Sequence, residues 1–518
     1  MDRIYQQMYD DTEIISEKSQ EGSEIKKLFS GQTVFLTGCT GFIGKCLTEK
    51  LLRETELKKL FVLIRPKEEL SVEQRLDKFF QDEVFEPLRK MVPDFARKVE
   101  PIMGDLAKKD IGLSEKDRKK LTEETTIIIH NGSTTKFYER ISNVLKINVL
   151  GTQHLLDLAI ECKTLKAFTY ISSAFSNSNH DVEERFYDPP VDLRIIPDLI
   201  ASDESLPGGL TEETVNQIIG GSFNTYTFSK ALAENIVKEY SRKVAFPCAV
   251  HRPGLVISAY REPIKGWVDD SNGPVTGFVA ASLGLLHVIH CNSWPKDFIP
   301  VDMTVNSILA STWDVIINQI DAREAVVYNY GSSIVNPITL HRMQELVEVE
   351  AYEKPSDKMV WAYFCSITSC VYYFYLMDML THLLPALIID GALLLQGKRP
   401  KALQAYFQFR KQLNFLTKGL TSKQVINCQK SKKVWNRLNP VDSDLFFCDI
   451  RNLDWDEFAE TFWLGMRLFI LKDPLNTVES GRSKFKKLRI FNILTVTATF
   501  LIFLYLVNRV TGILSILC

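Results

Sequence analysis

Several common signals are absent from this chain of 518 residues. Acidic and basic residues nearly cancel, with a formal net charge of -2, so there is no reason to expect nucleic acid as a partner, which usually requires a basic surface. The ten cysteines include no CxxC pair, and no His/Cys cluster has the spacing of zinc ligands. The N-terminus is polar and acidic and lacks the apolar core of a signal peptide. We therefore expect a cytosolic, thiol-reduced body with no disulfide framework and no metal site.

The composition is that of a globular protein, with 45% hydrophobic and 24% charged residues and no enrichment in glycine or proline. The length suggests two or three domains, because typical domains have roughly 100–200 residues. We predict five segments: an acidic N-terminal lead-in (1–29), a dinucleotide-binding domain (30–305), a substrate-side connecting segment (306–358), a helical C-terminal domain (359–480) and a basic collar with a membrane anchor (481–518).

Short apolar strands alternate with helices through the first half of the chain. The order begins with a strand at 33–37, a glycine-rich turn, a helix over 45–54 and a second strand over 57–65. Further strand and helix patterns follow in alternation as far as about residue 253. Repeated strand–helix–strand units are typical of a parallel sheet. We therefore predict an α/β fold with a Rossmann-like, doubly wound parallel sheet, followed by a mainly helical C-terminal domain.

The turn after the first strand reads TGCTGFIG and precedes a helix. Gly38 permits the tight turn, Gly41 lets the backbone approach a pyrophosphate, and Gly44 allows close packing of helix on strand. The phosphates would then lie at the helix N-terminus, where free N–H groups favour negative charge. We assign the whole turn to cofactor binding: Thr37, Gly38, Thr40, Gly41, Phe42, Ile43 and Gly44.

Five further positions are candidates for the cofactor site. Arg65 ends the second strand, where an arginine suits the 2′-phosphate of NADP better than the ribose hydroxyls of NAD, unless it is an ordinary solvated arginine. Asp105, beside Leu106, follows another strand and is placed to accept from the adenine amino group, although a turn aspartate is nearly as good an explanation. Gly132 lets the backbone pass close to the cofactor, and Asn148 is expected to bond backbone or water near the catalytic lysine.

The candidate catalytic pair is Tyr226 and Lys230 in the sequence YTFSK. A spacing of four places both side chains on one face of a helix. Tyrosine is a poor acid–base group at its reference pKa of about 10, and a neighbouring ammonium favours the phenolate. Lys230 is also placed to hold the nicotinamide ribose. Upstream, a strand ends in YISSAF, where the hydroxyl of Ser173 (or Ser172) is a candidate to bind a substrate carbonyl.

The C-terminus carries an uncharged apolar stretch at 490–507 that is long enough to cross a bilayer. Five cations precede it, at Arg482, Lys484, Lys486, Lys487 and Arg489, and only Arg509 follows. This asymmetry predicts a single-pass anchor with the body of the chain in the cytosol. A buried core helix is the alternative.

A second apolar region covers 359–395. Asp378, Pro385 and Asp390 interrupt it, and carboxylates are costly inside a membrane. We favour an embedded or lipid-lining helical subdomain. A true membrane hairpin is the alternative.

These motifs resemble those of the extended short-chain dehydrogenases, and among them the alcohol-forming fatty acyl-CoA reductases. The similarity extends over nearly the whole chain, in TGCTGFIGKCLTEKLLR, HRPGLVISAYREPIKGWVDDSNGP, DFIPVDMTVN, HLLPALIID, FFCDIRNLDW and LGMRLFILKD. The last three blocks are similar to the family's male-sterility domain and are more specific, because simple epimerases and steroid dehydrogenases lack them. Two departures are Phe175, where the family commonly has tyrosine, and Gly132-Ser133, where two alanines are frequent.

The resemblance implies NADPH as cofactor and a long-chain fatty acyl-CoA as substrate, reduced through a bound aldehyde to the alcohol with release of CoA. Ser173 and Tyr226 would stabilise the oxyanion, and Tyr226 would then act as general acid with support from Lys230. The anchor would place the enzyme on the endoplasmic reticulum or the peroxisome, for both of which the family has precedents. A homodimer is possible.

Three alternatives stay open at this point. One is a reductase that stops at the aldehyde, and another is a membrane-bound hydroxysteroid or sterol dehydrogenase with the same catalytic face. The third is a tail-anchored scaffold that binds lipid or nucleotide without catalysis.

Overall fold

A computed structural model describes residues 22–66, 70–136, 139–177, 181–269, 274–318 and 324–517. Its centre is a seven-stranded sheet with the order β10-β6-β5-β4-β1-β2-β3, in which every neighbouring pair is parallel. The strands are β1 Thr33–Thr37, β2 Lys59–Ile64, β3 Val99–Met103, β4 Ile127–His130, β5 Ala167–Ile171, β6 Cys248–Pro253 and β10 Val326–Tyr330. The strand order reverses direction between β1 and β4. This is the switch point at which doubly wound sheets bind their ligands.

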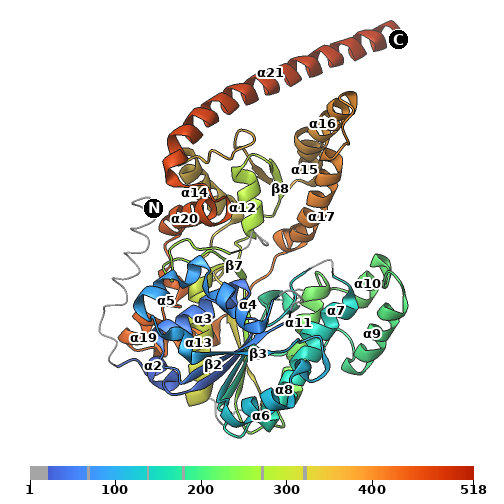
Figure 1. Ribbon diagram of the computed structural model, residues 1–518. Coiled ribbons are helices and arrows are strands. Elements are labelled where there is room, and N and C mark those ends of the chain that lie inside the picture. Colours follow the sequence, from blue (N-terminus) through green and yellow to red (C-terminus); the bar gives the residue numbers. More distant parts are fainter. Residues whose placement is uncertain are drawn as a thin grey trace.

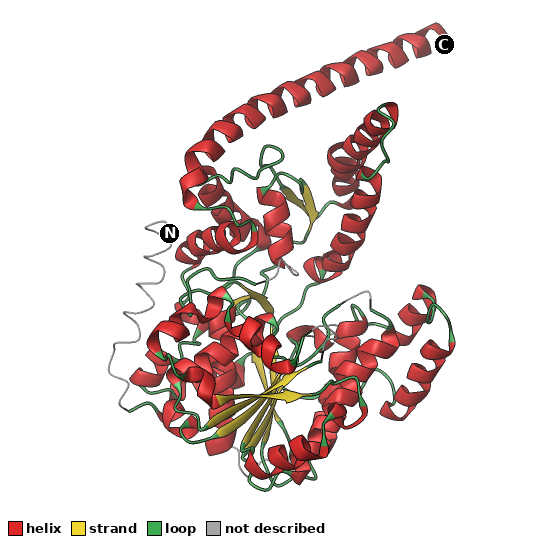
Figure 2. Ribbon diagram, in the orientation of Figure 1, coloured by secondary structure: helices red, strands yellow, loops and turns green. Residues whose placement is uncertain are grey.

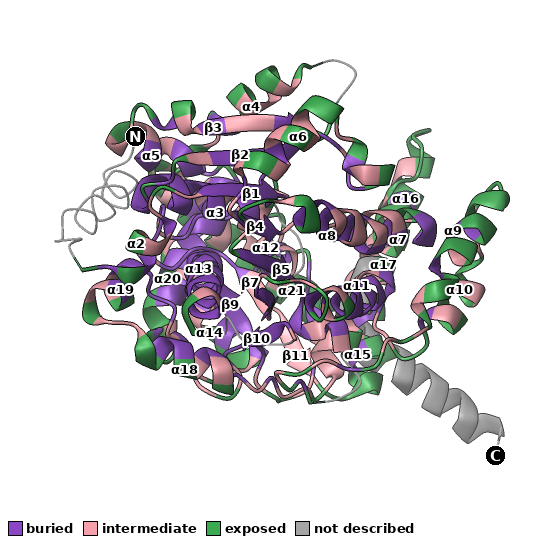
Figure 3. Ribbon diagram, turned by 90° about the horizontal axis from the view of Figure 1, so that it is seen from below, coloured by how far each residue is buried: buried purple, intermediate pink, exposed green. Residues whose placement is uncertain are grey.

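Helices cover both faces of the sheet (Figure 2). Alternate strand residues point to opposite faces. Val34 and Leu36 therefore join the core under α3 (Phe42–Glu54) and α13 (Val301–Asn318), whereas Phe35 joins a second core. That second core lies under α7 (Ile141–Leu145), α8 (Gly151–Glu161) and α11 (Thr225–Ser241). Both faces are buried, as all-parallel sheets require, and the view in Figure 3 shows this buried centre.

Smaller helices complete this part of the molecule. They are α4 Val72–Phe80, α5 Glu86–Met91, α6 Glu115–Glu124, α9 Ile196–Ser205 and α10 Glu212–Ile219. The predicted α/β fold and its Rossmann-like parallel sheet are confirmed. The sheet also takes a seventh strand, β10, from beyond residue 305, so the predicted limit of the dinucleotide-binding domain falls inside α13.

The predicted acidic lead-in ends in a helix, α2 (Glu24–Phe29). Ile25 and Phe29 lie one helical turn apart and are fully buried in the core beneath α13. Asp442, from the far end of the chain, accepts from the Ser23 hydroxyl at 2.5 Å and the Glu24 N–H at 2.9 Å. Residues 24–29 are therefore part of the folded body, while residues 1–21 lie outside the described residues.

The rest of the described chain is mainly helical, with two small parallel strand pairs. β7 (Leu255–Ile257) pairs with β9 (Phe298–Pro300), and β8 (Val288–His290) pairs with β11 (Ser366–Thr368). The helices are α12 Pro274–Ser282, α14 Leu340–Glu353, α18 Gln429–Arg437, α19 Pro440–Leu445 and α20 Trp455–Gly465. α18 returns to the sheet and packs against β10 and α13, so the second half of the chain does not form a wholly separate body.

Two helical arms rise on the side away from the central sheet (Figure 1). The first comprises α15 (Val371–Asp378), a π-helical turn (Met379–Leu383), α16 (Leu384–Leu395) and the returning α17 (Ala402–Thr421). The second is the long α21 (Val478–Leu517), which includes the predicted anchor at 490–507. Among the residues described with their side chains, one helical stretch, Val371–Leu395, is long and apolar enough to cross a membrane.

Candidate functional site

The glycine turn connects β1 to α3 at the switch point of the sheet. Gly38 has φ +71°, a backbone conformation that favours glycine, and a Cβ there would lie 2.7 Å from the backbone of Gly132. A Cβ on Gly44 would lie 2.0 Å from the Gly38 carbonyl oxygen and 2.8 Å from Cys39 Cα. The structure therefore requires glycine at both positions before any ligand is considered.

Gly41 differs from these two glycines. It is exposed, its φ is -85°, and a Cβ there would have the Gly38 carbonyl oxygen, at 3.5 Å, as its nearest neighbour. Gly41 is also the N-cap of α3 and offers no side-chain hydrogen bond to the first N–H groups of the helix. These N–H groups and the open space in front of them form a site suited to an anion.

The other turn residues border this helix end. Thr40 is exposed, and Phe42 and Ile43 are partly buried. The Phe42 ring stacks on Trp267 with a centroid distance of 5.4 Å. This stacking holds the start of α3 against the segment that follows β7.

Thr37 begins a buried hydrogen-bond chain. Its Oγ1 accepts from the Gly132 N–H at 3.0 Å and lies 2.7 Å from His130 Nδ1, while His130 Nε2 lies 2.9 Å from Thr152 Oγ1. Thr152 in turn donates to the Asn148 carbonyl at 2.7 Å. Burial, with the nearby Lys230 charge, lowers the pKa of His130 to about 3, so the ring is neutral and can accept at Nδ1 and donate at Nε2. The Thr37 side chain therefore holds the loop after β4 in place.

The loop after β4 is tightly packed from behind. A Cβ on Gly132 would lie 2.7 Å from Leu106 Cδ1 and 3.0 Å from Thr37 Oγ1, so internal packing alone requires a small residue there. Leu106 is itself buried. Asp105, at the end of β3, uses one carboxylate oxygen to accept from the Ala107 N–H at 3.0 Å in a turn.

Asn148 joins the loop to the catalytic helix. Its side chain accepts from the Thr134 N–H at 2.8 Å, donates to the Thr134 carbonyl at 3.1 Å and donates to Ser229 Oγ at 2.9 Å. Ser229 precedes Lys230 and donates to the Tyr226 carbonyl at 2.7 Å. Asn148 thus bonds the backbone at Thr134, and it reaches the helix of Lys230 through the Ser229 side chain.

Two arginines lie near the end of β2. Arg65 is exposed directly after the strand. Arg75, on α4, donates to the Arg65 carbonyl, and its charge lowers the pKa of the buried Cys39 in the glycine turn, although burial raises that pKa more. Arg75 is therefore a second cation beside the turn. Arg75 was not predicted from the sequence, because ten residues separate it from Arg65.

Tyr226 and Lys230 lie on the first turns of α11, beside the end of β5. The Lys230 ammonium is buried, donates to the Ile171 carbonyl at 2.7 Å, and lies 4.7 Å from the Tyr170 ring centroid and 5.9 Å from that of Tyr226. Burial lowers the pKa of Lys230 to about 7, partly offset by the charge of Glu234. Burial raises the pKa of Tyr226 to about 12, partly offset by a hydrogen bond with the Ser173 side chain.

The structure distinguishes the two candidate serines. Ser172 donates to Glu234 Oε1 at 2.5 Å and faces the interior. Ser173 forms a hydrogen bond with Tyr226 and accepts from the Phe175 N–H at 3.2 Å. Ser173 is therefore the serine beside the tyrosine. Phe175, which departs from the family pattern, supports it through its backbone.

A buried ion pair lies behind the serines. Glu234 receives two hydrogen bonds from Arg252, at 2.8 and 2.6 Å, in addition to the bonds from Ser172 and Ser176. Arg252 also donates to the carbonyls of Glu183 and Arg185, at 3.0 and 3.1 Å. The pair thus ties α11 to the end of β5 and to the chain beyond it. Glu234 was not predicted from the sequence, although its position four residues after Lys230 places it on the same helix face.

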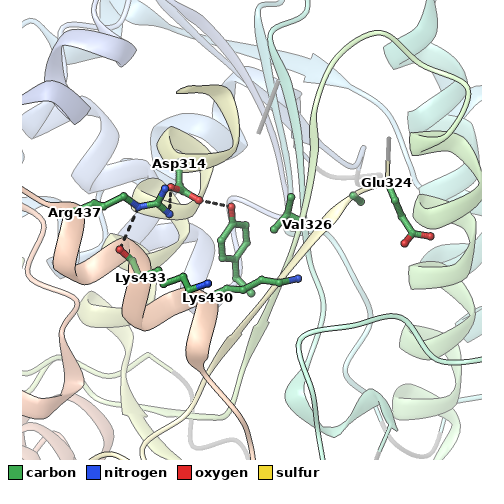
Figure 4. A pocket seen from close by; sticks show the side chains of 8 residues that line it. Asp314, Glu324, Val326, Lys430, Lys433 and Arg437 are labelled. Atoms are coloured by element: carbon green, nitrogen blue, oxygen red, sulfur yellow. Dashed lines mark hydrogen bonds and ion pairs between the residues drawn. The ribbon is translucent and has the colours of Figure 1, made fainter. Parts of the chain in front are cut away.

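A polar cavity of about 330 Å³ lies elsewhere, at the edge strand β10 (Figure 4). Its lining includes Lys430, Lys433 and Arg437 of α18 together with Glu324 and Asp314. Asp314 pairs with Arg437 at 2.5 Å and accepts from the Tyr328 hydroxyl at 2.6 Å. The cavity opens at the amino end of β10, whereas the glycine turn and Ser173 lie at the carboxyl ends of their strands. It is therefore separate from the candidate active site.

Comparison with known families and proteins adds an independent line of evidence. One family model, described as male sterility protein and named for NAD binding, matches residues 36–308, and a second, also described as male sterility protein, matches residues 381–473. The first begins in β1, includes the sheet strands as far as β6 and ends inside α13, before β10. The second covers α16 to α20.

Several relatives named as fatty acyl-CoA reductases match nearly the whole chain. Fatty acyl-CoA reductase wat of Drosophila melanogaster is 32% identical over 495 residues, which is 94% of this chain and 93% of that protein. Fatty acyl-CoA reductase 1 of Homo sapiens is 32% identical over 468 residues, 90% of each chain. Fatty acyl-CoA reductase 2 of Mus musculus is 32% identical over 491 residues, 93% of this chain and 92% of that protein.

Solved structures share the fold at lower identity. The reductase domain of a nonribosomal peptide synthetase from Mycobacterium tuberculosis has a TM-score of 0.58 at 19% identity and covers 89% of this chain and 96% of its own. The terminal reductase domain of the myxalamid biosynthetic pathway has a TM-score of 0.54 at 19% identity, with coverages of 89% and 97%. These two likenesses show the architecture alone.

Proposed function

Because this chain belongs to the fatty acyl-CoA reductase family, we propose that it reduces long-chain fatty acyl-CoA to fatty alcohol with NADPH, through a bound aldehyde. The observation that carries the proposal is the convergence of Ser173, Tyr226 and Lys230 at the end of β5, beside the glycine turn. The alternative products and substrates considered above become outcomes of the test.

The residues around the turn fit a dinucleotide. The N-terminus of α3 is uncapped and open in front of Gly41, as a pyrophosphate would need. Arg65 and Arg75 would meet the 2′-phosphate that distinguishes NADPH from NADH. Lys230 and the segment around Gly132 would border the nicotinamide half. When bound, NADPH supplies the hydride for both reductions.

Ser173 and Tyr226 would stabilise the oxygen of the substrate carbonyl as it gains negative charge. A pKa of about 12 keeps the Tyr226 phenol protonated at neutral pH, so it can donate a hydrogen bond. Ser173 adds a second donor from the neighbouring strand end. Donors held in position before the reaction are often the largest single source of rate enhancement. Collapse of the resulting hemithioacetal breaks the carbon–sulfur bond, releases CoA and leaves the aldehyde.

In the aldehyde step, Tyr226 would give its proton to the developing alkoxide. A phenol with a raised pKa is a weak acid, so the reaction depends on the nearby Lys230 ammonium, which stabilises the phenolate that forms. Lys230 is oriented by the Ile171 carbonyl and by the Tyr170 ring. The neighbouring Glu234 favours the charged form of the lysine.

We also propose that α21 anchors the chain in the membrane of the endoplasmic reticulum or the peroxisome, with the catalytic body in the cytosol. The sequence at 490–507 is uncharged and follows five cations within a single continuous helix. A long-chain alcohol partitions into lipid, so an enzyme held at a membrane can release its product directly into the bilayer.

The test is to incubate detergent-solubilised full-length protein with palmitoyl-CoA and NADPH, and to identify the lipid products by mass spectrometry. We expect one hexadecanol for every two NADPH oxidised. Aldehyde at one per NADPH would identify a one-step reductase instead. No oxidation with acyl-CoAs of any chain length, despite NADPH binding, would point to a sterol-type substrate or to a non-catalytic role.

Two matched variants test the assigned acid. Tyr226→Phe should lower kcat by about 10²–10⁴-fold with NADPH binding retained, as expected for loss of a general acid. Tyr240→Phe removes a phenol from the same helix, where it donates to Asp157, and should leave kcat unchanged. Full activity in Tyr226→Phe would show that another group supplies the proton.

A further inference from the structure

The first helical arm exposes an apolar surface, formed by α15, the π-helical turn and α16. More than half of the 25 residues in Val371–Leu395 are large hydrophobic residues that are exposed, with only 17% of the apolar window buried. Leu395 is 93% exposed and Ile388 63% exposed. A core helix of a soluble domain would be mostly buried, and soluble proteins rarely expose a continuous apolar surface of this kind.

The carboxylates in this arm turn away from the apolar surface. Asp378 is buried against α17, where it accepts from the Tyr406 hydroxyl at 2.8 Å and pairs with Arg410 at 3.4 Å. His382 lies 3.0 Å from the same carboxylate and accepts at its other ring nitrogen from the His287 N–H at 3.1 Å. The polar groups therefore pair with one another and leave the outer surface apolar.

Asp390 is likewise used inside the arm. Its carboxylate accepts from the backbone N–H groups of Lys401, Ala402 and Leu403, at 2.8 to 2.9 Å, and so caps the N-terminus of α17. A polar group in contact with lipid must be satisfied by the protein itself, because no water is available. The two aspartates that argue against a membrane hairpin in the sequence meet this condition in the structure.

The end of the arm is basic. Lys398, Arg399 and Lys401 are exposed around the turn between α16 and α17. No aspartate or glutamate occurs from residue 391 to residue 423, a stretch that carries seven lysines and arginines. Cations next to an apolar surface complement the anionic head groups of a cytosolic leaflet. They also make it costly to push the tip of the arm through a bilayer.

The apolar surface and α21 lie on the same side of the molecule (Figure 1). Trp361, ten residues before α15, donates from its indole N–H to Asn492 Oδ1 at 2.8 Å and packs against Phe491 at a centroid distance of 5.2 Å. The apolar part of α21 thus begins in contact with the segment that leads into the first arm. A membrane entered by α21 would be close to both.

We propose that α15 and α16 lie in the cytosolic leaflet of the same bilayer that α21 enters, as a second membrane contact that does not cross. The apolar surface would face the acyl chains, and Lys398, Arg399 and Lys401 the head groups. This inference rests on the membrane anchor proposed above. The first arm is also connected to the candidate active site: the chain leaving α17 pairs at Ile426 with Val182, in the segment that follows Ser173.

The test uses full-length protein with p-benzoylphenylalanine in place of Ile388, reconstituted into liposomes of phosphatidylcholine and phosphatidylserine. Two other exposed isoleucines serve as controls, Ile493 in α21 and Ile160 on α8 of the catalytic body, 55% and 54% exposed. After irradiation, mass spectrometry should find lipid adducts at 388 and 493 and none at 160. NADPH oxidation by each variant verifies its fold.

The outcomes separate the two proposals. Adducts at 493 without adducts at 388 would overturn the second contact and leave the anchor standing, whereas no adducts at 493 would contradict the anchor itself. Cross-links between two copies of the chain at 388, in place of lipid adducts, would show that the apolar surface is a subunit interface. Replacing Lys398, Arg399 and Lys401 with glutamate should lower the adduct yield at 388 at least about fivefold on anionic liposomes, and an unchanged yield would refute the role of the basic tip.

Discussion

The glycine turn offers a test in which two alanine substitutions, at Gly44 and at Gly41, should differ in their effect on stability but share their effect on NADPH binding. In Gly44→Ala, the new methyl would lie 2.0 Å from the Gly38 carbonyl oxygen and 2.8 Å from Cys39 Cα. Both atoms belong to the backbone and cannot rotate away. Forced overpacking of this kind costs about 1–3 kcal/mol or more. We therefore expect a lower melting temperature together with loss of NADPH binding.

In Gly41→Ala, the nearest atom to the new methyl is 3.5 Å away and the backbone is extended, so alanine fits. The cost should be the small difference between glycine and alanine at an N-cap, below about 1 kcal/mol. The methyl instead occupies the space in front of the helix end, where the pyrophosphate would lie. Loss of hydrogen bonds to a charged group, at about 1.5–3 kcal/mol, would weaken NADPH binding by about 10–100-fold.

The assay is a fluorescence titration of NADPH with purified protein in detergent and no acyl-CoA, combined with a thermal melt of each variant. Gly277→Ala, on α12, is a matched control because a Cβ there meets nothing within 4 Å. It should leave the Kd unchanged and should not lower the melting temperature, because alanine is favoured over glycine by about 0.5–1 kcal/mol within a helix. Wild-type NADPH affinity in Gly41→Ala would refute the placement of the phosphates at this turn. If Gly41→Ala lowered the melting temperature as much as Gly44→Ala does, the inference that a methyl group fits at position 41 would be wrong.

Three further predictions follow from the charged groups. With a pKa of about 7, Lys230 loses its charge as the pH rises through neutrality, so kcat/KM should fall there. Glu234→Gln removes a charge that raises this pKa and should move the fall in kcat/KM to lower pH. An unshifted pH profile would contradict the influence of Glu234 on the pKa of Lys230. Arg252→Ala leaves the buried Glu234 carboxylate unpaired and should lower the free energy of unfolding by denaturant by about 3–5 kcal/mol. Arg242→Ala, which removes a surface ion pair with Glu324, should lower it by at most about 1 kcal/mol. Equal effects of the two variants would show that burial does not make the Arg252–Glu234 pair more important. Arg65→Ala should weaken NADPH binding at least about tenfold and leave NADH binding unchanged, and an equal loss for both would exclude recognition of the 2′-phosphate.

The Rossmann-like sheet was predictable because its signals are local. Apolar strands, a glycine turn and amphipathic helices recur within a few residues of one another, and each strand–helix unit can be recognised without its neighbours. The seventh strand was not predicted, because β10 is separated from its partner β6 by more than 70 residues of other structure. The helix over 24–29 was missed for the same reason, since Asp442 caps it from the opposite end of the chain.

The candidate site was partly predictable. The spacing of Tyr226 and Lys230 places them on one helix face, and that arrangement is present. Ser173 was preferred to Ser172 on the family resemblance, and the reason for the difference lies in the structure, where Ser172 bonds Glu234 and Ser173 bonds Tyr226. The buried partners Glu234, Arg252 and His130 were also missed, since a charged or polar residue in a sequence is ordinarily expected at the surface.

By itself, the sequence determined the strand order within each local unit, the glycines of the turn, the tyrosine–lysine pair and the apolar stretches of the two arms. These depend on side-chain periodicity and backbone conformation over short distances. Only the tertiary structure decided what occupies Ser172, why Gly132 must be small, and where the aspartates of the first arm find their partners. Those outcomes depend on atoms that come together from distant parts of the chain, and local spacing carries no record of such contacts.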